Sequence, residues 1–380
     1  MDNNFRLYLT AFLLFVAGNI LQLDEKSTVY MLLAGCSLIC LMIKLWNETH
    51  TQREIITDII VVGFALLLYM NSKAITILML AAFLVASKNI DVKRVIKYNL
   101  YFSIVLYITV IICSQIGIKQ NVYVQIKRMT GQVADRYSLG FEHPNQLHMY
   151  FFFIVLMWLY IYYEKVTIRT IVIMQVINIA LYKFSVSRTG ALSVIGVSVV
   201  YLIFRQRDFL NKKISQLMAF VFPLCTLASV VLAKIYTGNT IELIINKLLQ
   251  GRVSNSHYFM NKYGNHLFGK NFTSGSKSMI LDNSYVILWL KFGILFTVVL
   301  CILYYVAVKK MIKQSNRAAI LCVTMFAFYG ITEGFLSNIF MNFSLLFLGN
   351  IICEDIPELI ARGIHVKMPV ILEERWCRND

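Results

Sequence analysis

Residues 136 to 163, RYSLGFEHPNQLHMYFFFIVLMWLYIYY, decide the fold of this chain, because they join a polar, histidine-bearing segment directly to a long apolar run. Proline has no amide hydrogen and a fixed φ angle, so Pro144 predicts the first turn of a helix, with His143 extended just before it. The apolar residues that follow suffice to cross the hydrocarbon core of a bilayer. The stretch therefore predicts a membrane-spanning helix with polar groups at its mouth.

The composition of the whole chain is that of a polytopic membrane protein. Of its 380 residues, 58% are hydrophobic and 15% are charged, whereas soluble domains carry roughly 25% charged residues. The mean hydropathy is +0.66. Apolar windows recur along the chain, so we expect one all-α integral domain over residues 1–380, with about 12 spans. The expected spans are residues 5–23, 28–46, 55–71, 74–87, 98–116, 146–163, 168–184, 189–205, 214–233, 286–308, 318–335 and 339–353.

Lysine and arginine predict the orientation of these spans, because short cytoplasmic loops retain positive charge during insertion. The short loops on one side of the membrane contain many more lysines and arginines than those on the other side. The loops with more basic residues are on the same side as the N-terminus. We therefore expect both termini in the cytoplasm, including a tail at residues 354–380. The formal net charge of +16 follows mainly from this inner bias and requires no nucleic-acid partner.

Two long loops, residues 117–145 and 234–282, are expected outside although they carry several basic residues, since long loops cross regardless of charge. An anionic ligand would explain this outer positive charge, and so would attraction to anionic lipid headgroups. In the second loop, TIELIINKLLQG has Thr240 as a candidate N-cap and Gly251 as a stop, which predicts a short helix in the membrane interface. The Gly, Asn, Ser and aromatic mixture that follows is typical of sugar-binding surfaces and also of ordinary surface loops.

Three arginines are expected on the same outer side: Arg136, Arg188 and Arg252. Guanidinium binds phosphate through a bidentate fork, so their convergence would suit a pyrophosphate, although a single such arginine is more often an interface anchor. His143, Asn145 and the free amides of the Pro144 helix start share one surface, which also suits an anion. The sequence contains no paired carboxylates of DxD spacing, no P-loop, no dinucleotide fingerprint and no HExxH, so we expect neither a metal site nor a cofactor.

Taken together, these motifs resemble the O-antigen polymerase and ligase superfamily, and Wzy-type repeat-unit polymerases in particular. The motifs are RYSLGFEHPNQLH (136–148), SRTGAL (187–192), LLQGR (248–252) followed by NHLFGKNF (265–272), and DNSYVILWLKFGIL (282–295). The resemblance covers most of the chain and implies a GT-C-like, metal-independent inverting glycosyltransferase. Such an enzyme joins undecaprenyl-pyrophosphate-linked oligosaccharide repeats on the outer face of the bacterial cytoplasmic membrane. The product would be an O-antigen, a capsule or an exopolysaccharide, and a flippase and a chain-length regulator are the implied partners.

The resemblance also assigns roles to residues. Arg188 and Arg252, with Arg136 third, are expected to bind the pyrophosphate, since fixed positive charge must hold the departing group. Asp282 is the expected general base, although ligase-like relatives place a histidine there. His143 is the rival base, because an ordinary histidine pKa of about 6.5 suits the role. Glu142 and Glu333 are weaker candidates. The remaining residues expected to contact substrate are Asn145, Asn283, Tyr285 and Glu333.

Two alternative functions remain open from the sequence. An O-antigen-type ligase would share nearly all of these features, because it differs mainly in its acceptor. A polysaccharide flippase or transporter would keep its substrate groups near the membrane midplane, often within repeats and broken helices. Here the notable polar residues gather at the outer ends of the expected spans, which favours chemistry at the membrane surface.

Overall fold

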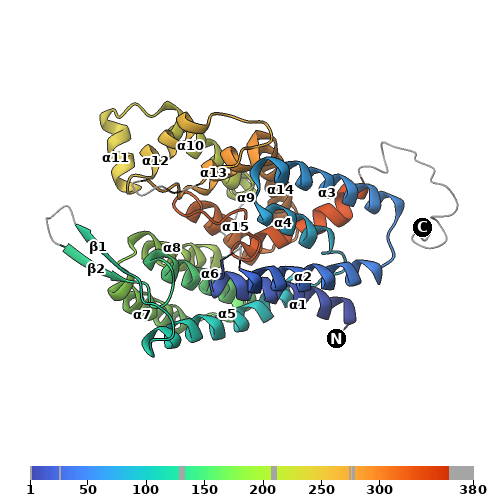
Figure 1. The fold of residues 1–380 in the computed structure, drawn as a ribbon, viewed down its shortest axis with the longest axis horizontal. Helices are drawn as coiled ribbons and strands as arrows, with labels where there is room; N and C mark the ends of the chain where they lie inside the picture. The colour runs from blue at the N-terminus through green and yellow to red at the C-terminus, as the bar shows by residue number, and fades with distance from the viewer. Residues whose placement is uncertain are drawn as a thin grey trace.

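The computed structural model describes residues 2–24, 27–127, 133–206, 212–273, 275 and 279–358, and it is mostly helical (Figure 1). Seven helices in this part of the chain are long and apolar enough to cross a membrane, as expected of a multi-pass membrane protein. They are α2 (Thr28–Trp46), α3 (Gln52–Ser72), α5 (Val92–Gln115), α6 (Pro144–Tyr162, extended by η1, Tyr163–Lys165), α7 (Ile168–Ser185), α8 (Arg188–Arg205), and the continuous stretch of α13 (Ser284–Ile287), η2 (Leu288–Phe292) and α14 (Gly293–Lys313).

The remaining expected spans do not form helices of this kind. The first matches α1 (Asn3–Ile20), which is not one of the seven, and the fourth matches the short α4 (Ile75–Val85). The expected span 214–233 is divided into α9 (Lys212–Met218) and α10 (Val221–Ile235), with Pro223 in the first turn of α10. The two final spans are also shorter or irregular: α15 (Arg317–Tyr329), then η3 (Phe343–Leu348) and η4 (Ile351–Asp355).

The irregular segment after α15 has a local physical cause in its asparagines. The Asn338 side chain accepts a hydrogen bond from the amide of Phe340 (3.0 Å), and the Asn342 side chain donates to the carbonyl of Leu336 (3.0 Å). These bonds offer the backbone an alternative to a helix. The segment 330–342 therefore turns instead of continuing α15, and this turn carries Glu333.

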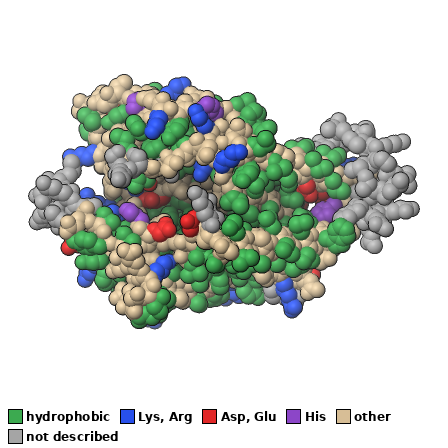
Figure 2. All heavy atoms as spheres, in the orientation of Figure 1, with side chains coloured by type: hydrophobic (Ala, Val, Ile, Leu, Met, Phe, Trp, Pro, Cys, Tyr) green, Lys and Arg blue, Asp and Glu red, His purple; other side chains and the backbone are tan. Residues whose placement is uncertain are grey.

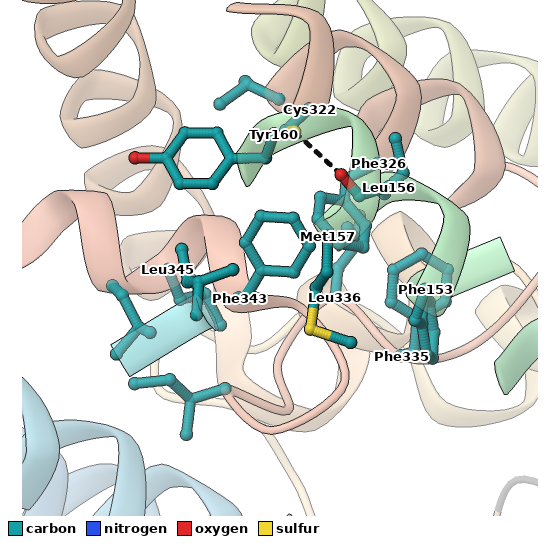
Figure 3. Close-up of a cluster of buried hydrophobic side chains, with 14 of the residues drawn as sticks. Phe153, Leu156, Met157, Tyr160, Cys322, Phe326, Phe335, Leu336, Phe343 and Leu345 are labelled. Atoms are coloured by element: carbon teal, nitrogen blue, oxygen red, sulfur yellow. Dashed lines mark hydrogen bonds between the residues drawn. The ribbon is translucent and has the colours of Figure 1, made fainter. Parts of the chain in front are cut away.

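Helix α6 is the central helix of the fold. Its apolar window is 72% buried, whereas the windows of the other six long helices are 22–44% buried. Figure 3 shows Phe153, Met157 and Tyr160 of this helix packed among side chains of α15 and of the segment that follows it. The Cys322 thiol of α15 lies 3.9 Å from the Leu156 carbonyl at this contact. The stretch that begins at Pro144 thus forms the core around which the other helices pack.

The first long loop contains an antiparallel hairpin, so the prediction of an all-α fold is wrong at this point. Strands β1 (Tyr123–Lys127) and β2 (Val133–Tyr137) pair in a register that sets Val124 opposite Arg136. The two strands are short and contain both polar and apolar residues. The alternation of side chains that predicts a strand is therefore not evident in the sequence of this polar loop. In Figure 1 the hairpin lies at the same end of the molecule as α11 and α12, opposite the N-terminal end of α1.

The second long loop is more ordered than its composition indicates. Its short helix is confirmed as α11 (Thr240–Leu248), but the N-cap is Asn239 and not Thr240. Gly251 adopts a left-handed φ of 84° and leads directly into α12 (Arg252–Tyr263), where we expected an adaptable segment. The side chains of Val253, Ser256, Phe259 and Met260 form the buried face of α12. This helical periodicity is masked by the polar residues between them.

Two glycines join this loop to the helix that follows it. Backbone hydrogen bonds run from Lys270 to Leu290 (3.0 Å) and from Ile294 to His266 (3.1 Å). A Cβ at Gly269 would lie 2.1 Å from the Lys291 carbonyl oxygen, and a Cβ at Gly293 would lie 2.3 Å from the Gly269 amide nitrogen. The loop backbone thus lies directly against the π-helical turn η2, where only glycine allows this approach.

We predict that Gly269→Ala destabilises the protein far more than Gly238→Ala. Both glycines have left-handed φ angles, 78° and 83°, but a Cβ added at Gly238 would have no neighbouring atom within 4 Å. The left-handed backbone alone costs about 1–2 kcal/mol for alanine, and the clash at Gly269 should raise the total to about 3 kcal/mol or more. Thermal unfolding of the detergent-solubilised proteins measures this, and equal losses of Tm would contradict the close packing.

Candidate functional site

The first turn of α6 folds as the sequence predicts, and its Asn145 side chain is bonded to Arg136. Pro144 occupies the first helical position, and the extended His143 is the N-cap, whose Nδ1 accepts a hydrogen bond from the Asn145 amide (3.1 Å). The Asn145 side-chain oxygen accepts a hydrogen bond from the Arg136 guanidinium, and Arg136 Nε donates to the Ser185 carbonyl (2.7 Å). Arg136 is only 9% exposed. The hairpin is thereby joined to the first turn of α6 and to the C-terminal end of α7.

Arg252, the first residue of α12, forms a buried ion pair with Glu333. Its NH2 group lies 2.9 Å from Glu333 Oε1, and its Nε donates to the Thr332 carbonyl at 2.5 Å. Both side chains are less than a tenth exposed. Charge-assisted hydrogen bonds of this kind are stronger than neutral ones, and burial strengthens them further. The pair connects the second outer loop to the turn after α15.

Glu333 lies at the centre of a wider group of polar residues. Its Oε1 also accepts a hydrogen bond from the Thr189 hydroxyl at the start of α8 (3.3 Å). Arg136 lies close enough that the charges of Glu333 and Arg252 act on it. Burial raises the pKa of Glu333 to about 7, against the opposing effect of Arg252. Glu333 therefore binds a proton more readily than an ordinary glutamate does.

Asp282 lies beside the same ion pair but is more accessible. Its Oδ2 is 4.0 Å from Arg252 NH2, and its side chain is 33% exposed, compared with 8% for Glu333. Burial raises the pKa of Asp282, and Arg252 opposes this shift. Two carboxyl groups of unequal exposure thus share one guanidinium group.

The residues that follow Asp282 support the site from inside the protein. Asn283 caps α13 by accepting hydrogen bonds from the amides of Tyr285 (3.0 Å) and Val286 (3.3 Å). The Tyr285 hydroxyl donates to the Ala327 carbonyl (2.6 Å), and the residue is fully buried. Both were predicted to contact substrate, but in the structure their polar groups are used by internal partners.

Ser284 positions the turn that carries Glu333, a role that the sequence did not predict. Its hydroxyl donates to the Glu333 carbonyl at 2.5 Å. The same oxygen accepts hydrogen bonds from the amides of Phe335 (2.9 Å) and Leu336 (3.2 Å). A serine between two other polar residues gives no pattern from which this role could have been inferred.

Arg188 differs from the other two arginines. It is the first residue of α8, next to Thr189, and its side chain is exposed. No hydrogen bond or ion pair of its guanidinium is found within the described part of the chain. Arg188 is therefore a free cation at the edge of the polar group, available to a ligand without loss of an internal contact.

His148 is a second residue whose role the sequence did not predict, although it lies in the opening motif. It is fully buried on α6 and is bonded through Nδ1 to the Ser185 hydroxyl (2.7 Å) and through Nε2 to Asn178 (3.1 Å). A Cβ at Gly190 would lie 2.4 Å from His148 Cβ, so the glycine of SRTGAL allows α8 to approach α6. His148 thus determines how the two motif-bearing helices pack.

The two remaining candidates for the base are placed differently. His143 is half-buried, and its pKa is lowered by burial and by the charge of Arg136. Glu142 is exposed and lines a separate pocket, where its backbone amide donates to Gln22 (2.6 Å). The structure therefore brings together Arg252, Asp282 and Glu333, and the charges of this group act on Arg136. Arg188 precedes Thr189, which bonds Glu333, and Glu142 lines a separate pocket.

Figure 2 shows this face of the molecule hollowed between the region of α10 to α12 and the helices below it in the view. Acidic and histidine side chains gather in the hollow, and basic side chains lie above it. Among the described residues, no three His, Cys, Asp or Glu side chains are grouped so that they could hold a metal ion. The charged groups available here are the arginines and the two carboxyl groups.

A scan against protein-family models and searches of curated proteins and of solved structures found no match to this chain. A function must therefore be inferred from the residues and their geometry. The physical features that matter are a buried ion pair, an accessible carboxyl group and an exposed arginine.

We predict that Arg252→Ala lowers the free energy of unfolding by about 3–5 kcal/mol, because Glu333 is then buried without its counter-charge and must stay unpaired or take up a proton. Adding Glu333→Gln in the same chain should recover much of this loss, since the ionisable group is removed while the contact with Thr189 is kept. Lys234→Ala, at an exposed position, is the control. Thermal unfolding measures all three variants, and a double variant no more stable than Arg252→Ala would exclude this explanation.

Proposed function

We propose that this protein is a glycosyltransferase of the O-antigen polymerase kind. It would join lipid-pyrophosphate-linked oligosaccharide repeats on the outer face of the bacterial cytoplasmic membrane. The observation that supports this most is the grouping of Arg252, Glu333 and Asp282 within reach of the charge of Arg136. Arg188 adds an exposed cation beside this group.

The reaction makes two demands that these residues can meet. The departing pyrophosphate needs fixed positive charge, which Arg136, Arg188 and Arg252 supply without a metal ion. The attacking hydroxyl needs a proton acceptor, and Asp282 suits this role because its side chain is a third exposed and its pKa is raised by burial. Glu333 is too enclosed to meet a sugar hydroxyl directly.

Glu333 would instead respond to the donor. A pyrophosphate that bonds Arg252 takes away the positive charge that opposes the raised pKa of Glu333. The carboxyl group then gains affinity for a proton at the moment when the acceptor hydroxyl must lose one. Donor binding and proton uptake are coupled in this way through one guanidinium group.

The proposed membrane topology is the one that the charge pattern predicts: about 12 spans, both termini inside and both long loops outside. The short apolar helices α4, α10 and α15 and the irregular segment 343–355 would supply the crossings beyond the seven long helices. The hairpin, α11 and α12 lie at one end of the molecule, which agrees with a common outer side (Figure 1).

We predict that purified protein polymerises a synthetic undecaprenyl-pyrophosphate repeat unit with a chelator present, and that Arg188→Ala loses this activity without losing stability. Arg188 is exposed, so its removal should change the free energy of unfolding by less than about 0.5 kcal/mol. Chain-length ladders measure the product, and Tm measures the fold.

Lys183→Ala is the matched control, because Lys183 is an exposed base at the end of α7. Normal ladders from Arg188→Ala would contradict the proposed role of this arginine. Transfer to a different acceptor with no polymer would indicate a ligase, and movement of the lipid across the bilayer without transfer would indicate a flippase.

We predict that Asp282→Asn lowers the turnover at least about 100-fold, the usual contribution of a general base. His143→Asn should keep most of the activity, because asparagine is a good N-cap and preserves the start of α6. The rising limb of the pH profile should lie above the ordinary aspartate value, since burial raises the pKa of Asp282. The opposite ranking of the two variants would assign the base to His143.

A further inference from the structure

A polar pocket of about 150 Å³ lies among α1, α2, α4 and α6 and takes no part in the chemistry described above. Its walls come from the C-terminal end of α1, the first turns of α2, α4 and α6, and the segment 338–341. A cavity of this size accommodates one six-membered ring, as an engineered 150 Å³ cavity accommodates benzene.

Four carboxamide side chains are the main polar groups of this pocket, and they are fixed in position. Gln22 donates to the side-chain oxygen of Gln146, and its own oxygen accepts a hydrogen bond from the Glu142 amide (2.6 Å). Asn338 donates to the Asn19 side-chain oxygen (2.7 Å). Each carboxamide has further donor or acceptor capacity beyond these bonds. The network therefore presents oriented donors and acceptors to a ligand.

The other described walls are aromatic or aliphatic, and no lysine or arginine lines the pocket among the residues that the structure describes. Tyr30, Tyr150 and Phe340 contribute rings, and the Tyr150 hydroxyl is held by the Asn19 carbonyl (2.7 Å). Among the described lining residues, Glu142 alone is formally charged. A polyhydroxyl ring suits such a lining, because it offers hydroxyl groups to the amides and C–H faces to the rings.

The pocket is connected to the charged site through two short chain segments. Glu142 directly precedes His143, whose pKa is lowered by burial and by the charge of Arg136. Asn338 lies on the same turn as Glu333, and that turn is held by Ser284. The pocket is thus linked to the charged group through Glu142 and Asn338 but shares no lining residue with it.

We propose that this pocket binds one uncharged sugar residue of the glycan, held by the Gln22, Gln146, Asn19 and Asn338 carboxamides. This inference depends on the proposed function in one respect: the sugar is taken to belong to the oligosaccharide repeat unit. The charged site would bind the pyrophosphate end of the donor, and the amide pocket would bind a sugar that lies away from the phosphates.

Saturation-transfer NMR on the full chain in lipid nanodiscs tests this proposal, with methyl glycosides of glucose, galactose, N-acetylglucosamine and rhamnose as probes. At least one probe should bind the wild-type protein. Thr76 also lines the pocket, and Thr76→Trp, which fills the space without removing a carboxamide, should abolish the signal. Gln146→Leu should weaken binding about tenfold, the effect of losing one to two hydrogen bonds. Gln125→Ala, on the exposed hairpin, is the control and should bind as the wild type does.

The proposal is overturned if none of the four probes binds, or if both Thr76→Trp and Gln146→Leu bind as the wild type does. If Thr76→Trp does not fold, Gln146→Leu decides alone. The outcome is independent of the polymerase assay, because the probes carry no pyrophosphate. If the protein binds a sugar but makes no polymer, the proposed function is contradicted and the sugar-binding proposal is kept. If the protein makes polymer but neither variant changes sugar binding, the sugar-binding proposal is contradicted and the proposed function is kept.

Discussion

The arrangement of the candidate site depends on the buried ion pair between Arg252 and Glu333. Arg252 begins α12 in the second long loop, Glu333 follows α15, and Thr189 attaches the start of α8 to the same carboxyl group. Removing two charges from water costs several kcal/mol for each ion and is repaid only when the geometry is good and further hydrogen bonds are made. The Thr332 carbonyl and the Thr189 hydroxyl supply those bonds. Because this desolvation cost offsets much of the attraction, the ion pair adds little net stability. Its main effect is to fix α12, the turn after α15 and the start of α8 relative to one another.

The same requirement explains where the helices are interrupted. Backbone groups away from water must be paired, so an irregular segment among apolar helices is tolerated only where other groups satisfy it. Ser284 and Asn342 both pair with the turn after α15, and the loop around Gly269 pairs with the π-helical turn η2. These two interruptions therefore have identifiable partners. The turn after α15 lies at the candidate site, where it carries Glu333.

The sequence predicted the long helices and the start of α6 because these depend on local properties: apolar length, and the fixed φ angle of Pro144. It also predicted that Arg136, Arg188 and Arg252 lie on one side and, through the resemblance, that they share a site with Asp282, with Glu333 as a weaker candidate. The structure groups Arg252, Asp282 and Glu333. It missed the hairpin, α12 and the break after α15, whose conformations are set by tertiary packing and by side-chain to backbone bonds. Ser284 and His148 were missed for the same reason, since a single buried polar residue has a role only once its partners are known.

The unequal exposure of the charged groups argues for an order of events at the site. Arg188 is exposed and unpaired within the described structure, so it can meet an anion first at no cost in internal contacts. Arg252 is 5% exposed and bound to Glu333, so it can bind an incoming anion only by releasing the Glu333 carboxylate. That exchange leaves Glu333 without its counter-charge in a buried position, where the proton becomes its preferred partner. Anion binding at Arg252 would therefore be accompanied by proton uptake at Glu333, beside the more exposed Asp282.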